Sequence, residues 1–171
     1  MGDQTKLRAY VSLGSNCPVA EEKLAEALTA LAQLPDMTLG AVSPLYRTEP
    51  QGYSSQPWFL NQVVELFPGE TWRPCNLVDA LLEMEAQLGR ERSPDPTLRF
   101  GPRVIDADLL LFGQERSTDP HCIVPHPRLT VRAFALRPLL DVAPLLVIEG
   151  LPVRDWLARI ECRVEGDRIF Q

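Results

Sequence analysis

The order of two hydrophobic periodicities along the chain constrains its fold more than any other feature of the sequence. Apolar and polar residues alternate over Leu7–Leu13, which predicts a half-buried strand. After a break at Gly14-Ser15-Asn16, apolar residues recur at helical spacing over Pro18–Leu34, which predicts an amphipathic helix. The further elements that the pattern predicts are extended segments at 37–43 and 45–48, a strand at 59–67, a helix capped by Asn76 and ended by Gly89, a strand at 103–112, a helix at 129–140 and a strand at 145–148.

Strand–helix–strand–strand–helix–strand is the split βαβ order of ferredoxin-like folds, and it predicts an α+β sandwich with an antiparallel or mixed sheet. The chain has 171 residues, of which 45% are hydrophobic and 23% are charged. This is the size and composition of a single globular domain, so residues 1–171 are expected to form one unit. In the weakly patterned segment Leu151–Gln171, Trp156 and Leu157 predict one packing helix.

Hydropathy and charge limit the partners that the chain can have. No stretch approaches the ~20 apolar residues of a membrane helix, and the polar segment Met1–Lys6 does not resemble a secretory signal. The formal net charge of −6 disfavours long nucleic acids and anionic membranes. We therefore expect a cytoplasmic, monomeric protein with small-molecule partners.

The four cysteines include no C-x-x-C pair, which predicts buried or free thiols in a reducing compartment. They are Cys17, Cys75, Cys122 and Cys162. A zinc site would have to combine Cys122 with His121 and His126, the only histidines. No fourth ligand lies at a customary spacing, so zinc is disfavoured.

Two carboxylates on the strongest predicted strand are the first candidates for chemistry. Asp106 and Asp108 lie two residues apart, so their side chains share one face of the strand. Ile105, Ala107, Leu109 and Leu111 would fill the other face. Two carboxylates that close repel one another, and an oxygen-only site of this kind favours Mg²⁺ or Mn²⁺. The alternative is an exposed edge strand with two solvated carboxylates.

Arginines gather on either side of this pair in the sequence. Arg90, Arg92, Arg99 and Arg103 precede it, opposed only by Glu91 and Asp95, and Arg128 and Arg132 follow His126. Cations beside a carboxylate pair favour a polyphosphate that is bound together with Mg²⁺. Surface salt bridges on a loop are the alternative. The sequence has no Walker A motif, no G-x-G-x-x-G and no G-x-S-x-G, which excludes the common nucleotide folds and serine hydrolases.

Five motifs appear in the order found in one known family. They are Y-V-S-L-G-S-N at 10–16, Y-R-T-E-P at 46–50, F-L-N at 59–61, R-F-G-P-R-V-I-D-A-D-L-L-L-F at 99–112 and V-P-H-P-R-L-x-x-R-x-F at 124–134. From about Leu7 to Ile148 the chain resembles 6-hydroxymethyl-7,8-dihydropterin pyrophosphokinase of folate biosynthesis. The resemblance implies an α/β/α arrangement of three layers around an antiparallel sheet.

The resemblance also implies a reaction and a set of site residues. The enzyme would transfer the β,γ-diphosphate of ATP to the pterin hydroxymethyl oxygen and release AMP, with two Mg²⁺ ions held by Asp106 and Asp108. Arg90 and Arg92 would serve catalysis from a loop that closes over the substrate. The implied ATP-binding residues are Glu85, Arg99, Arg103, Leu109, His126 and Arg132. The implied pterin-binding residues are Thr48, Pro50, Gln51, Phe59, Asn61 and Phe134.

Two other functions remain open on the residues alone. One is a binding module that holds a nucleotide or RNA without catalysis, although an acidic chain with one short basic segment argues against RNA. The other is a two-metal phosphohydrolase, which would form AMP or ADP from ATP without a pterin. An assay of AMP release distinguishes these two functions from the pyrophosphokinase, because only the pyrophosphokinase would release AMP in a manner that depends on the pterin.

Overall fold

The computed structural model describes residues 6–51, 55–98 and 102–171. Arg99 and Phe100 therefore lie outside the described residues. The main sheet contains β1 (Ala9–Ser15), β2 (Met37–Val42), β3 (Tyr46–Thr48), β4 (Phe59–Pro68), β5 (Asp106–Phe112), β8 (Arg163–Glu165) and β9 (Arg168–Phe170). The helices are α1 (Ala20–Ala32), α2 (Pro74–Gln87), α3 (Ala133–Val142) and α4 (Val153–Ala158), and a two-stranded sheet contains β6 (Val147–Ile148) and β7 (Leu151–Pro152).

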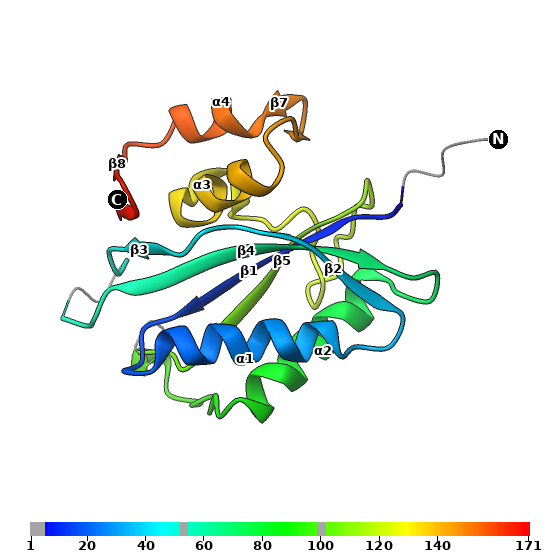
Figure 1. Ribbon diagram of the computed structural model, residues 1–171, viewed down its shortest axis with the longest axis horizontal. Helices are drawn as coiled ribbons and strands as arrows, with labels where there is room; N and C mark the ends of the chain where they lie inside the picture. The colour runs from blue at the N-terminus through cyan, green and yellow to red at the C-terminus, as the bar shows by residue number, and fades with distance from the viewer. Residues whose placement is uncertain (1–5, 52–54, 99–101) are drawn as a thin grey trace.

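The main sheet has the order β5-β1-β4-β3-β9-β8, and β2 also pairs with β4 (Figure 1). β1 lies antiparallel to both β4 and β5, so that Gly14 faces Asn61 on one side and Asp106 on the other. β3 and β9 pair in parallel, which makes the sheet mixed, not antiparallel throughout. The chain is thus α+β with a largely antiparallel sheet.

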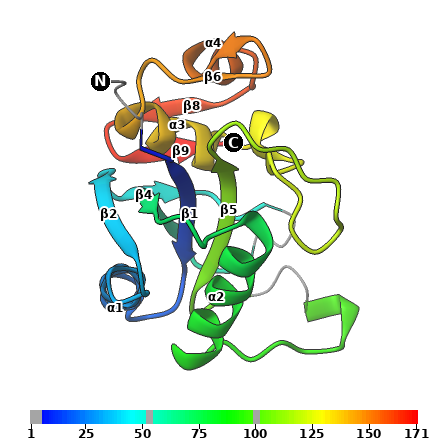
Figure 2. The same cartoon turned by 90° about the vertical axis from the view of Figure 1, so that its right-hand side faces the viewer.

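Helices cover both faces of the sheet (Figures 1 and 2). The helices α1 and α2 bury Leu24, Leu77 and Leu81 against one face, in a core that also contains Ala107 and Leu109. On the other face α3 and α4 form a second core, to which β1 and β4 contribute Tyr10 and Val63. Residues opposite one another in antiparallel strands share a face, so Asp106 and Asp108, opposite Gly14 and Ser12, lie on this second face.

The predicted alternation of faces along β5 is wrong at its end, because the register with β1 shifts there. Ala107 and Leu109 belong to the first core as expected, but Leu111 packs in the second core and Phe112 in the first. The pairing with β1 shifts between Tyr10 and Val11, because an extra residue of β5 is accommodated there. The irregularity lies beyond the carboxylates and leaves their common face intact.

Several element boundaries also differ from the predicted ones. The helix α2 begins at Pro74, and Asn76 lies inside its first turn, where its side chain accepts a hydrogen bond from the Arg73 N–H at 2.7 Å. The segment 129–131 is a 3₁₀ turn before α3. The segment after 150 contains strands β7, β8 and β9 besides the predicted helix. In the part of the chain that is described, no helix is both long and apolar enough to cross a membrane.

Candidate active site

Asp106 is held between two arginines that approach it from different segments. Its Oδ1 lies 2.6 Å from Arg90 Nη1, and its Oδ2 bonds to Arg103 Nη1. Burial alone would favour the neutral acid, but the two guanidinium groups outweigh it and lower the pKa of Asp106. The carboxylate therefore stays ionised at neutral pH.

Glu85 of α2 contacts Arg90, which it shares with Asp106, and a further arginine, Arg92. Its side chain is 2% exposed, and its Oε1 accepts a hydrogen bond from the Ala107 N–H at 2.7 Å. Arg90 Nη1 lies 2.8 Å from Oε1 and Arg92 Nη2 lies 2.7 Å from Oε2. Burial raises the pKa of Glu85 despite these partners. The side chain thus pairs a backbone donor of β5 and positions two arginines.

Asp108 has its own cationic partner on the other side of the site. Arg132 Nη1 lies 3.0 Å from its Oδ2. His126 Nδ1 accepts a hydrogen bond from the Arg128 N–H at 3.1 Å, so the neutral ring carries its proton on Nε2, which lies 3.9 Å from Asp108 Oδ2. Burial lowers the pKa of His126, and the two arginines lower it further against the effect of Asp108. At neutral pH the ring is therefore a neutral hydrogen-bond donor.

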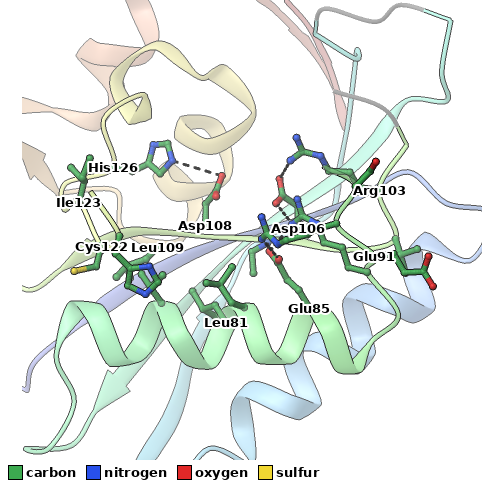
Figure 3. A pocket seen from close by; sticks show the side chains of 18 of the residues that line it. Leu81, Glu85, Glu91, Arg103, Asp106, Asp108, Leu109, Cys122, Ile123 and His126 are labelled. Carbon is green, nitrogen blue, oxygen red and sulfur yellow. Dashed lines mark hydrogen bonds and ion pairs between the residues drawn. The ribbon is translucent and has the colours of Figure 1, made fainter. Parts of the chain in front are cut away.

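A cavity of about 820 Å³ lies in front of these groups (Figure 3). It is bounded by α2, the segment after Gly89, β5 and the segment 120–127. Eight of the residues expected at the site line this cavity. They are Glu85, Arg90, Arg92, Arg103, Asp106, Asp108, Leu109 and His126. The structure thus brings together most of the expected ATP-binding residues.

A smaller cavity of about 340 Å³ contains most of the residues expected to bind a pterin. These are Thr48, Gln51, Phe59, Asn61 and Phe134, whereas Pro50 is not among its lining residues. Arg132, which is expected to bind ATP, lines this smaller cavity instead of the larger one. The two cavities share Arg103, Asp106 and Asp108, which therefore stand at their boundary.

Gly14 of β1 lies beside Asn61 of β4, and both residues line the small cavity. Asn61 donates a hydrogen bond from Nδ2 to Thr48 Oγ1 at 2.5 Å. A Cβ on Gly14 would lie 2.7 Å from Asn61 Oδ1, so only glycine allows this position of the amide. The sequence predicts that the strand breaks at Gly14-Ser15-Asn16, which is wrong for Gly14 and Ser15, because both residues belong to β1 and pair with β4.

Asn16 joins the segments that carry the two cavities. Its Oδ1 accepts a hydrogen bond from the Arg103 N–H at 2.7 Å. Its Nδ2 donates to Gln56 Oε1 at 3.0 Å and to the Pro57 carbonyl at 3.1 Å. Asn16 is 3% exposed. It was not predicted as a site residue, because its partners are distant in the sequence.

Several lining residues of the small cavity are not among the predicted site residues. Four of them lie within the family motifs, namely Ser12, Gly14, Glu49 and Arg128, whereas Gln56 and Gln171 lie outside every motif. Gln171 follows β9, a strand of three residues without a clear periodic pattern. Only the three-dimensional pairing of β9 with β3 brings it to the site.

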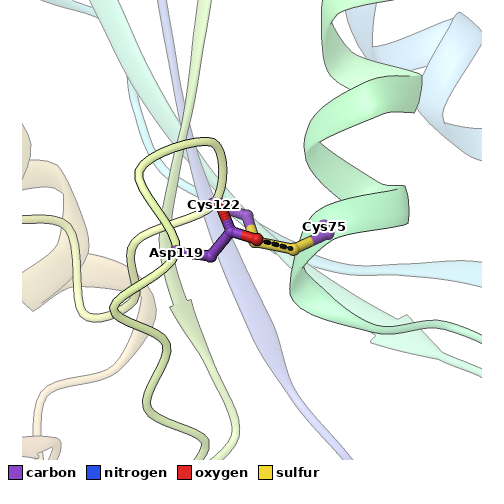
Figure 4. A group of neighbouring side chains, drawn as sticks. All are labelled: Cys75, Asp119 and Cys122. Carbon is purple, nitrogen blue, oxygen red and sulfur yellow. Dashed lines mark hydrogen bonds between the residues drawn. A yellow bond between two sulfur atoms is a disulfide. The ribbon is translucent and has the colours of Figure 1, made fainter.

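The cysteines differ in part from the expected free thiols. Cys17 and Cys162 are free, but Cys75 and Cys122 form a disulfide that connects α2 to the segment between β5 and α3 (Figure 4). Asp119 lies beside the two sulfur atoms. His121 Nε2 instead contacts Asp79 Oδ1 at 2.6 Å, and His126 faces Asp108, so the zinc combination considered from the sequence does not assemble.

The donor set at the boundary of the cavities fits magnesium. Asp106 and Asp108 offer only oxygen ligands on one face of β5, as hard divalent cations require. Their repulsion does not by itself demand a cation, because Arg90, Arg103 and Arg132 already compensate both charges. The chemistry of the donors, not their mutual repulsion, thus supports a metal.

Carboxylates and arginines at the junction of two cavities supply the positioning and the charge neutralisation that an enzyme needs to transfer a phosphoryl-type group between two substrates. Comparisons with known proteins specify this class. Residues 10–144 match the family described as 7,8-dihydro-6-hydroxymethylpterin-pyrophosphokinase (HPPK). The chain belongs to this family.

Two similar proteins support this assignment over most of the chain. The 2-amino-4-hydroxy-6-hydroxymethyldihydropteridine pyrophosphokinase of Pseudomonas aeruginosa is 42% identical over 160 residues, which cover 93% of this chain and 94% of that protein. The protein of the same name from Bacillus subtilis is 40% identical over 134 residues, covering 78% and 77%.

Solved structures share the fold at low sequence identity. A structure described as HPPK-DHPS in complex with substrates has a TM-score of 0.64 at 13% identity, and the match covers 90% of this chain and 43% of that one. The wild-type HPPK-DHPS of Plasmodium falciparum with STZ-DHP has a TM-score of 0.64 at 14% identity, covering 98% and 49%. The chain thus spans about half the length of these structures or less.

Proposed function

We propose that this ATP-dependent pyrophosphokinase of folate biosynthesis holds ATP in the large cavity and 6-hydroxymethyl-7,8-dihydropterin in the small one. It transfers the β,γ-diphosphate of ATP to the hydroxymethyl oxygen and releases AMP. The single observation that carries this assignment is that the two cavities meet at Arg103, Asp106 and Asp108. A group transferred from one substrate to the other would pass this boundary.

The small cavity has the properties that a flat heterocycle requires. Phe59 and Phe134 offer aromatic faces, and Asn61 and Thr48 offer polar groups that are already oriented by their mutual hydrogen bond. A volume of about 340 Å³ suits a small bicyclic ring, whereas about 820 Å³ suits a nucleoside triphosphate. Thr48, Pro50, Gln51, Phe59, Asn61 and Phe134 are the pterin-binding residues that we propose.

The large cavity has the charge that a triphosphate requires. Arg90 and Arg92 lie on the segment after α2, and Arg103 lies just before β5. Arginine forks bind phosphate oxygens in two-point contacts, so these residues would hold the triphosphate and neutralise charge that develops on it. Glu85, Arg99, Leu109, His126 and Arg132 complete the proposed ATP site.

Asp106 and Asp108 are the residues that would hold two Mg²⁺ ions. When bound, such ions neutralise phosphate charge and lower the pKa of an attacking hydroxyl group. Asp106 is ionised, and both carboxylates face one side of β5, where they can position both substrates. Diphosphate transfer depends mainly on positioning and on charge neutralisation, so no strong general base is needed.

We also propose that the chain is a single ferredoxin-like domain that acts as a monomer. The strand order β5-β1-β4, with β2 and β3 on the far side of β4, supports the split βαβ class. Helices on both faces support the three-layer arrangement.

The decisive experiment measures AMP release from ATP and Mg²⁺ with and without the reduced hydroxymethyl pterin. We expect AMP only when the pterin is present, in equal amount to the pterin diphosphate. Turnover that is independent of the pterin indicates a phosphohydrolase. Nucleotide binding without any turnover indicates a binding module.

A further inference from the structure

One wall of the small cavity is formed by a part of the chain that the family match at residues 10–144 does not include. The strand β9 pairs in parallel with β3, so that Thr48 lies opposite Ile169, and the Glu49 N–H donates to the Ile169 carbonyl at 3.2 Å. Ile169 is fully buried and packs with Tyr46. These contacts anchor the β8–β9 hairpin beside the cavity.

Gln171, directly after β9, reaches the cavity from this hairpin. It is a lining residue together with Glu49, Asn61 and Phe134. Its backbone N–H donates to Glu49 Oε2 at 2.9 Å, and its Nε2 lies 3.4 Å from the Glu49 carbonyl oxygen. Two contacts with one neighbour thus hold the residue in place.

The side-chain oxygen of Gln171 is left without a partner. Oε1 is buried, and no donor of the described residues lies within hydrogen-bond distance of it. A buried acceptor without a donor is unfavourable, and native proteins rarely keep one unless a ligand or water completes it. The last torsion of a glutamine side chain is soft, so a small rotation can present Oε1 to the cavity.

We propose that Gln171 is a pterin-binding residue whose Oε1 accepts a hydrogen bond from an N–H on the pyrimidine edge of the ring. The aminopyrimidinone half of a pterin carries such donors at its exocyclic amino group and at its ring nitrogen. The inference rests on the proposed assignment of the small cavity. It adds to that assignment a residue from outside the family motifs.

The test is the variant Gln171→Met, which keeps the length of the side chain but has no amide oxygen. Calorimetry measures pterin binding in the presence of Mg²⁺ and a non-hydrolysable ATP analogue, and kinetics give KM for each substrate. We expect the pterin Kd and KM to rise about three- to tenfold, as for the loss of one hydrogen bond. The KM for ATP should be unchanged, and the melting temperature should fall only slightly, because the 3.4 Å contact of Nε2 with the Glu49 carbonyl is lost as well.

Two further variants separate this role from a structural one. Gln171→Ala should weaken pterin binding to the same extent, whereas a loss with methionine alone indicates steric obstruction and overturns the proposal. Arg168→Ala, at an exposed position of β9, should behave like the wild type. A pterin Kd within twofold of wild type in Gln171→Met, or an equal loss of ATP binding, also overturns it. Failure of the wild-type protein to bind pterin at all would instead contradict the proposed function.

Discussion

The two carboxylates of β5 depend on different partners, although only one residue, Ala107, separates them. Asp106 contacts Arg90 and Arg103, whereas Asp108 contacts Arg132. Each is therefore oriented independently, and each faces both cavities. This division of partners lets the contribution of either carboxylate be measured without removing the other.

Asp106→Asn and Asp108→Asn should each lower kcat by at least about 100-fold, because a neutral amide is a poor ligand for Mg²⁺ and cannot replace the lost charge. Steady-state kinetics at saturating Mg²⁺ measure this, and circular dichroism checks the fold. The half-buried Asp155 on α4, distant in sequence from the site, provides the matched control, since Asp155→Asn should keep normal activity. Near-normal kcat in either site variant would contradict the metal assignment.

Gly14→Ala should damage pterin binding more than stability. The added Cβ would lie 2.7 Å from Asn61 Oδ1, so the amide must shift from its present position. We expect KM for the pterin to rise several-fold while KM for ATP stays within about twofold, because one hydrogen bond of the pterin site is disturbed. Gly89→Ala is an unsuitable control because Gly89 has a φ of +98°, whereas an exposed Thr29→Ala on α1 is suitable. Equal changes in both KM values would show that Asn61 is not specific to the pterin.

At the scale of elements, the sequence predicts what depends on local periodicity and misses what depends on distant pairing. The common face of Asp106 and Asp108 follows from the two-residue repeat of β5 and is confirmed. The predicted face of Leu111 is wrong. A register shift between β5 and β1 depends on both strands, so it cannot be predicted from the residues of one strand alone. The strands β8 and β9 have three residues each, too few for a periodic signal.

The same reasoning explains which part of the site could be predicted. Motif resemblance identified residues such as Glu85 and Asn61, which the structure brings into the two cavities. Gln171 and the Cys75–Cys122 disulfide depend on the approach of segments far apart in the chain. The spatial proximity of such distant segments leaves no periodic pattern or motif in the sequence.

The disulfide connects α2 to a segment that lines the large cavity, since Cys122 is itself a lining residue. It closes a loop with a sequence separation of 47, so the double variant Cys75→Ser/Cys122→Ser should lose about 2–4 kcal/mol of unfolding free energy. The KM for ATP should rise as this wall loosens, with KM for the pterin unchanged. Denaturant unfolding and kinetics measure both effects.

Treatment of the wild type with dithiothreitol should reproduce the behaviour of the double variant. The free thiols Cys17 and Cys162 provide the control, because Cys162→Ser should not change the response to the reductant. If reduction leaves both stability and the KM for ATP unchanged, the connection does not stabilise the cavity.

At the scale of the whole molecule, the free energy of unfolding should fall at alkaline pH because Tyr46 titrates there. Burial, and then the hydrogen bond to Asp141, raise the pKa of Tyr46 from 10.0 to about 12. A pKa that is higher in the folded state gives stability that is fully present below pH 10 and is lost as pH rises towards about 12. The loss should be on the order of 2 kcal/mol.

Tyr46→Phe should remove this part of the pH dependence. Unfolding by denaturant at intervals between pH 9 and about pH 12 should show a shallower decline in the variant than in the wild type. A residual decline is expected from Tyr10, whose pKa is also raised by burial. Identical declines in the two proteins would show that Tyr46 titrates normally in the folded state.

The position of Asn16 has a consequence for how the two substrates affect one another. Its amide bonds Arg103, at the boundary of both cavities, and also Gln56, a lining residue of the small cavity. A nucleotide that shifts the Arg103 backbone would therefore also shift Asn16 and Gln56 beside the second substrate. Thermodynamic linkage then requires reciprocity, so that ATP and the pterin each alter the affinity of the other by the same factor.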